Sequence, residues 1–201
     1  MTFQKEVFFP EIAHWLYNYF ISIGFSETAS KYFNMLSLFI GMLLIISIVD
    51  FIIRKILIKA FTAFAKKTTT TFDDFMVTNK VPLNVAHIVP LLLAKEFMPT
   101  VLVDSLAEKV LHVFSIILTL WIVRSLLNTL KSYFKTLPHL KDKPIDSYIQ
   151  VFMIFAWVIG LTSALAIVTG FPFIKFITTL GAASAVVILI FKDTILGFVA
   201  S

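Results

Sequence analysis

The chain contains no cysteine among its 201 residues, which excludes disulfides, thiolate nucleophiles and cysteine metal sites. Charge is also scarce, because Asp, Glu, Lys and Arg make up 14% of the residues, against roughly 25% in soluble domains. The sequence has no Ser-His-Asp order, no HExxH helix, no glycine-rich phosphate loop and no pair of catalytic carboxylates. These absences favour a protein that is not an enzyme and that uses no metal ion or organic cofactor.

Hydrophobic residues are abundant instead. They form 59% of the chain, 22 of them are Phe, and the mean hydropathy of +0.93 is typical of a membrane protein. The formal net charge is +5, but the basic residues stand at the ends of apolar runs and are not gathered in one polar segment. We therefore interpret them as determinants of membrane orientation and expect membrane lipids, not nucleic acid, as partners.

Five apolar segments predict an all-α, polytopic membrane protein with five transmembrane helices: 33–53, 81–103, 106–130, 148–169 and 173–201. A spanning helix needs about 20 residues. The second segment is the weakest, because Pro82, Pro90 and Pro99 interrupt it, and it could instead be re-entrant or lie in the interface. The connections 54–80 and 131–143 are rich in Lys and Arg, which the positive-inside rule places in the cytoplasm. That placement requires the second segment to cross and leaves the N-terminus outside and the C-terminus inside.

Three regions follow from this pattern. Residues 1–32 are aromatic but broken by Pro10 and Gly24, and they read either as a periplasmic, interfacial segment or as an ordinary aromatic belt. Residues 33–170 form four outer helices, of which the first continues through 54–67 towards the inner leaflet. After it, Thr71 or Asp73 is expected to cap a new helix.

Polar residues inside the spans have plain structural explanations. Asp50 and Arg54 have the i,i+4 spacing of a helical ion pair, which we favour over a proton relay. His87 and His112 lie in different spans and do not make a metal site without further ligands.

The last region, 171–201, is unlike the others. Small residues stand together at its centre, including Gly181, Ala182 and Ser184, and small residues let helix backbones approach closely in a membrane. The helix then reaches Lys192 and Asp193, after which TILGFVAS is apolar again. Placing the charged pair at the inner membrane surface accounts for the charges but not for the second apolar piece. We therefore predict a kink near 192–193.

In 180–201, LGAASAVVILIFKDTILGFVAS, the sequence resembles the small-conductance mechanosensitive channel family (MscS-like). Leu180, Gly181, Ala182 and Ala183 match the start of the family's pore helix, and the ending is similar to that of the miniconductance, YbdG-like branch with five helices. The specific match covers about a tenth of the chain. The family usually has glycine at the hinge, where this chain has Lys192 and Asp193.

The resemblance implies a homoheptamer in the bacterial inner membrane, opening under membrane tension to release ions and small solutes during hypo-osmotic shock. Segment 171–201 would line the pore, and a cytosolic domain would follow residue 201. Ala185 and Leu189 stand at the positions of the family's two pore-sealing leucines. Because one of the two is alanine here, Leu189 would seal the pore alone or with a bulkier neighbour, Ile188 or Phe191. The residues implied at the pore and gate are Ala185, Ile188, Leu189 and Lys192, and those implied in helix packing are Gly181, Ala182 and Ser184.

Two other functions stay open. A secondary transporter would line a substrate path with polar residues of the outer helices: Asp50, His87, Glu96, His112 and Arg124. A non-conducting membrane scaffold would oligomerise through the small-residue helix alone. The polar break followed by TILGFVAS favours the channel, because a scaffold does not need it.

Overall fold

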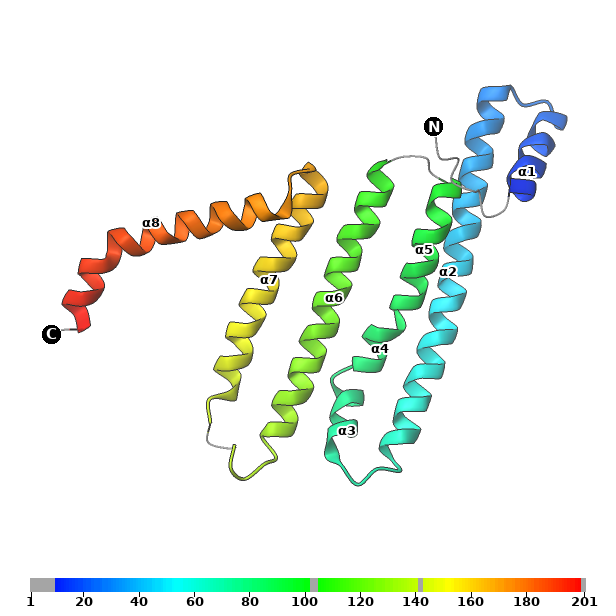
Figure 1. Cartoon of the computed structure of the whole chain (residues 1–201). Helices are drawn as coiled ribbons and strands as arrows, with labels where there is room; N and C mark the ends of the chain where they lie inside the picture. The colour runs from blue at the N-terminus through cyan, green and yellow to red at the C-terminus, as the bar shows by residue number, and fades with distance from the viewer. Residues whose placement is uncertain (1–9, 102–104, 141–142, 200–201) are drawn as a thin grey trace.

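The computed structural model describes residues 10–101, 105–140 and 143–199, and this part of the chain is helical without strands. Figure 1 shows a row of upright helices from which the last helix departs sideways. The helices are α1 (Pro10–Ser22), α2 (Glu27–Ala65), α3 (Thr71–Thr78), α4 (Val81–Ala86), α5 (Ile88–Val101), α6 (Ser105–Phe134), α7 (Ile145–Thr169) and α8 (Phe173–Val199).

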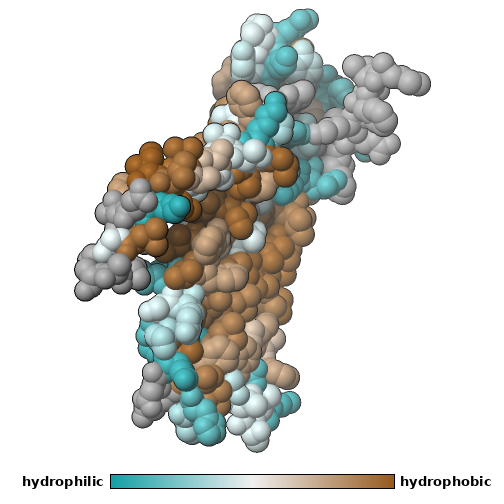
Figure 2. Space-filling model, turned by 60° about the vertical axis from the view of Figure 1, so that its left-hand side comes forward, coloured by the Kyte–Doolittle hydropathy of each residue, from teal (hydrophilic) through white to brown (hydrophobic). Residues whose placement is uncertain are grey.

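Five stretches are long and apolar enough to cross a membrane, judged by length and composition: Glu27–Ala65, Val81–Pro99, Leu106–Phe134, Ile145–Thr169 and Phe173–Lys192. The predicted all-α, five-helix membrane fold is therefore confirmed. Figure 2 shows the corresponding surface, with hydrophobic residues over the middle of the bundle and hydrophilic residues gathered at its two ends. A belt of this kind suits a bilayer, whose hydrocarbon core is bounded by water on both sides.

Helix α2 is longer than the apolar run that predicted it. It starts at Glu27 because the Ser26 hydroxyl accepts a hydrogen bond from the Ala29 N–H, which satisfies one of the free donors of the first turn. It continues to Ala65, so the predicted extension beyond residue 53 is confirmed. Helix α1 packs against α2 after a turn in which Gly24 adopts a φ of 97°, a conformation that glycine reaches without steric strain.

The cap of α3 differs from the prediction. The N-cap residue is Thr70, and both Thr71 and Asp73 lie inside the helix. The Thr70 hydroxyl donates to the Asp73 carboxylate at 2.9 Å. The acidic side chains of the first turn, Asp73 and Asp74, then stand where the helix dipole favours negative charge.

The second span is two helices, α4 and α5, separated at His87. Pro90 explains the break, because proline has no N–H to donate to the carbonyl of Ala86 and its ring clashes with that carbonyl in a continuous helix. A second break precedes α4, where Lys80 adopts a left-handed conformation with a φ of 62°. The short helix α4 is thus bounded by a change of direction at each end.

The rest of the bundle is held by apolar packing. Met42 of α2 forms a buried cluster with Met98 and Val101 of α5. Gly160 of α7 lies directly against Leu120 of α6, so these two helices approach closely. At one end of the bundle Asp146, in the first turn of α7, binds the ammonium groups of Lys131, in the last turn of α6, and Lys135, in the turn that follows α6.

The two basic connections, α2–α3 and α6–α7, lie at the same end of the bundle in Figure 1. The α7–α8 connection lies at the other end. This is the arrangement that alternate crossing requires, with the broken second span running from one end of the bundle to the other.

Candidate functional site

Helix α8 leaves the bundle after Gly170, which adopts a left-handed conformation with a φ of 75°. It packs against the end of α7, where the rings of Phe171 and Phe176 meet edge to face at 6.3 Å. Beyond that contact the helix runs away from the bundle (Figure 1). Every residue from 177 to 192 is exposed, so in one copy of the chain this spanning segment is uncovered on all sides.

The predicted pore residues lie along this uncovered part of α8. Leu189 is 71% exposed and Ile188 is 65% exposed, and Ala185 and Lys192 are exposed too. With 3.6 residues per turn, Ala185 lies one turn before Leu189 and Lys192 nearly one turn after it, so all three share a face of the helix. Ile188 adjoins that face.

The predicted packing residues lie one to two turns earlier. A side chain added at Gly181 would meet no atom within 4 Å, and Ala182 is exposed. The Ser184 hydroxyl donates to the Leu180 carbonyl of its own helix at 2.8 Å. This polar group is therefore satisfied without a partner helix, which lets it lie in an apolar contact.

The region of the predicted kink is continuous helix. α8 runs through Lys192 and Asp193 to Val199, and Figure 1 shows it changing direction in its red, C-terminal part. Lys192 is exposed; the side chain of Asp193 and residues 200–201 lie outside the described residues.

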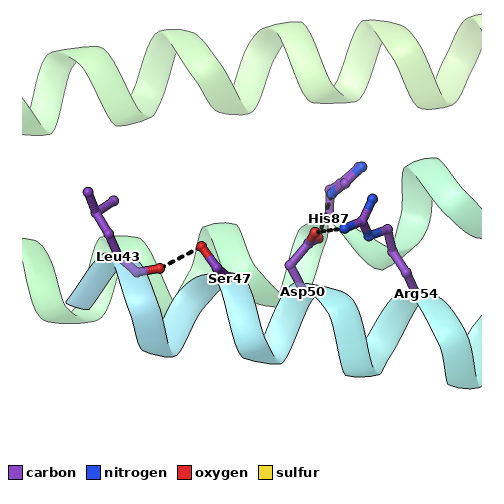
Figure 3. Close-up of polar contacts among 5 residues, drawn as sticks. All are labelled: Leu43, Ser47, Asp50, Arg54 and His87. Atoms are coloured by element: carbon purple, nitrogen blue, oxygen red, sulfur yellow. Dashed lines mark hydrogen bonds and ion pairs between the residues drawn. The ribbon is translucent and has the colours of Figure 1, made fainter. Parts of the chain in front are cut away.

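A second group of functional side chains lies inside the bundle, on α2 and at the break of the second span. Asp50 accepts a hydrogen bond from Nδ1 of His87 at 2.7 Å through Oδ1 and pairs with Arg54 at 2.9 Å through Oδ2 (Figure 3). The Asp50 side chain is 18% exposed. The predicted Asp50–Arg54 pair is confirmed, and His87 joins it from the turn between α4 and α5.

An open cavity of about 320 Å³ adjoins this group. Asp50 and His87 form its polar part together with Ser47, whose hydroxyl donates to the Leu43 carbonyl of its own helix. The rest of the wall comes from α2, α5 and α6: Ile46, Pro90, Leu91, Ala94, Leu111, Phe114, Leu118 and Trp121.

The polar residues considered for a transporter are not gathered in one place. Asp50 and His87 meet, but His112 lines a different cavity of about 570 Å³ between α6 and α7. Glu96 and Arg124 line neither of these two cavities. Within the described residues, no group of three or more His, Asp or Glu side chains could hold a metal ion.

Sequence reasoning named His87 and Asp50 together only for a transporter path and did not predict their contact. The signal was Pro90. A proline interrupts the helix before it, and a break inside a membrane leaves backbone polar groups that need partners, so polar side chains gather there.

Comparisons with protein-family models, with curated proteins and with solved structures gave no match. The functional argument therefore depends on the residues and geometry described above.

Proposed function

We propose that this chain is the membrane part of a mechanosensitive, MscS-like ion channel, which opens under membrane tension and releases ions and small solutes. The observation that carries the proposal is the uncovered helix α8. Its spanning segment has no covered residue from 177 to 192, and yet its composition is that of a helix–helix interface. Copies of α8 packed against one another account for both features, and the family resemblance makes the number of copies seven.

The small residues of α8 indicate whether lipid or protein covers this helix in the membrane. A helix that faces only lipid gains nothing from small side chains, because lipid tails are as apolar as leucine. In contrast, Gly181 and Ala182 let a neighbouring backbone approach closely, which increases van der Waals packing. The same stretch therefore supports self-association of α8 in the membrane.

Leu189 is the residue that we assign to the closed gate. A ring of apolar side chains blocks ions by dewetting, without filling the pore sterically. Ala185, one turn earlier, is too small to close the same ring, so the constriction falls at Leu189 with help from Ile188. Lys192 would place a ring of positive charge beside the constriction on the basic side of the membrane.

Tension opens such a channel because the open state occupies more membrane area than the closed state, which gives the two states different energies in a stretched bilayer. Helices α2 and α5–α7 would transmit the force. Their surfaces carry many exposed apolar side chains, including Leu44, Phe155 and Leu161, that would contact lipid. In this proposal the membrane is the bacterial inner membrane, with the basic connections in the cytoplasm.

The test is to reconstitute the purified protein, measure its oligomeric mass in nanodiscs and record currents from liposome patches under stepped suction. We expect an oligomer of about seven copies and currents that rise with suction. An oligomer that stays silent at every suction up to patch rupture would favour the scaffold. A monomer that exchanges a solute without suction would favour the transporter.

A further inference from the structure

Asp50 is an ionisable residue in the apolar part of α2, where a charged side chain adds unfavourable energy unless it is paired. Apolar side chains would pack α2 against α5 without that energy, as Met42 and Met98 do in the same pair of helices. The polar group formed by Asp50, Arg54 and His87 therefore needs an explanation other than packing.

The place of His87 indicates what the group holds. Helix α4 has six residues and lies between two breaks, one at Lys80 and one at His87. Its hydrogen bond to α6 is long, since the Asn84 amide donates to the Trp121 carbonyl at 3.4 Å. The contact of His87 with Asp50 is much shorter at 2.7 Å, and it ties the end of α4 to α2.

Helix α4 is buried in the bundle, since Val81, Pro82 and Ala86 are almost wholly covered, but it is bounded by a backbone break at each end. Its two flanking breaks can absorb a change in backbone direction, whereas α2 is unbroken from Glu27 to Ala65. A rearrangement of the bundle under tension would therefore separate α4 from α2 more readily than it would bend α2.

Protonation changes the charge of this group at His87. With Asp50 ionised, Arg54 charged and the imidazole neutral, the group has no net charge; a protonated imidazole adds one positive charge. Histidine is the side chain whose ordinary pKa lies between pH 5 and 8. The adjoining cavity of about 320 Å³, which His87 lines, has room for water.

Within the described residues, the cavity wall holds no ionisable side chain besides Asp50 and His87. Helix α3, which packs against α2 and α4, carries Asp73 and Asp74 in its first turn, outside that wall. Arg54 is the charged neighbour from α2, α4 carries none, and α5 and α6 give the cavity wall no ionisable side chain. Lys95 and Glu96 of α5 and Arg124 of α6 lie outside that wall.

We propose that Asp50, Arg54 and His87 form a proton-binding site that ties the second span to the first, and that a proton bound there raises the tension needed for opening. Protonation converts a neutral donor into a charged one, which turns the hydrogen bond to the ionised Asp50 carboxylate into an ion pair. A state in which His87 has left Asp50 loses this interaction.

The site itself can be tested without recording currents. Because the chain has no cysteine, spin labels can be attached at Ile56→Cys on α2, which is 56% exposed, and at Leu83→Cys on α4. We expect the distance distribution between them to narrow when a reconstituted sample goes from about pH 7.5 to about pH 5.5. The narrowing should vanish in His87→Gln and persist in His112→Gln, the matched histidine of the other cavity. A distance distribution that does not change with pH, or that narrows as much in His87→Gln as in the wild type, would overturn the proton site.

The link to opening rests on the function proposed above and has its own readout. The suction for half-maximal current should increase at the lower pH in the wild type and in His112→Gln, and stay constant in His87→Gln. Currents that respond to suction but not to pH would overturn the link while leaving the channel in place. A protein that carries no current at any suction would overturn both the channel and the link, and the labelled distances would still decide the proton site.

Discussion

Gly160→Ala is the change whose effect the structure defines most sharply. An ideal Cβ built at Gly160 would lie 2.7 Å from Cδ1 of Leu120 and 3.3 Å from its Cδ2 and Cγ. Leu120 is only 7% exposed, and both Leu120 and Gly160 line the cavity of about 570 Å³ between α6 and α7, so the Leu120 side chain can give way only by turning into that cavity. We therefore expect the overlap to force α6 and α7 apart or Leu120 out of its rotamer, which typically costs about 1–3 kcal/mol.

The helix propensity of alanine acts in the opposite direction, since it exceeds that of glycine by about 1 kcal/mol in a helix interior. Gly41→Ala measures that gain alone, because a Cβ at Gly41 of α2 meets nothing within 4 Å. The difference between Gly160→Ala and Gly41→Ala should therefore be about 1–3 kcal/mol of lost stability. Adding Leu120→Ala to Gly160→Ala should cost less than Leu120→Ala in the wild type, which is expected to cost about 2–5 kcal/mol.

The assay is reversible unfolding in mixed micelles followed by tryptophan fluorescence. Trp121 on α6 and Trp157 on α7 lie close in sequence to the two sides of the contact and should report its loss. A Gly160→Ala protein as stable as Gly41→Ala, with additive effects of the Leu120 change, would refute the close approach of α6 and α7 at this point.

Three further changes test other parts of the structure. Pro90→Ala supplies the missing N–H for the Ala86 carbonyl, so backbone amide hydrogen exchange should become slow across the former break between α4 and α5. An unchanged exchange rate there would mean that Pro90 does not cause the break. Thr129 of α6 is fully buried, and its hydroxyl donates a hydrogen bond to the Phe75 carbonyl of α3. Thr129→Val removes this bond and should lower the free energy of unfolding, measured by the same denaturation, by about 0.5–1.5 kcal/mol. Gly181→Leu should leave the single chain folded by circular dichroism but reduce its oligomeric mass, whereas Gly41→Leu should leave that mass unchanged; equal masses would contradict packing through α8.

The spans could be predicted from the sequence because their physics is local. A run of apolar residues decides whether a segment enters the membrane, and the runs in 106–130 and 148–169 lie within α6 and α7. The Asp50–Arg54 pair was predictable for the same reason, since i,i+4 neighbours meet on any helix.

Features that depend on residues distant in sequence were not predictable in this way. His87 lies 37 positions from Asp50, and their contact exists because Pro90 breaks the second span at the right depth. The cap of α3 shifted to Thr70 because several neighbouring threonines offer similar side chains, and local preference does not separate them. The direction of α8 could not be anticipated either, since it is governed by Gly170 and by whatever covers the helix in the membrane.

The most direct measurement of the central claim is a comparison of Leu189→Ser with Val187→Ser in liposome patches under stepped suction. The two residues lie two positions apart, so their side chains point roughly 200° apart around the helix. Both are exposed in the single chain, at 71% and 52%. We predict currents at lower suction in Leu189→Ser, because a polar ring would hydrate the closed pore, and a threshold near the wild type in Val187→Ser. Equal thresholds in all three proteins, or a lower threshold in Val187→Ser alone, would contradict a pore sealed at Leu189.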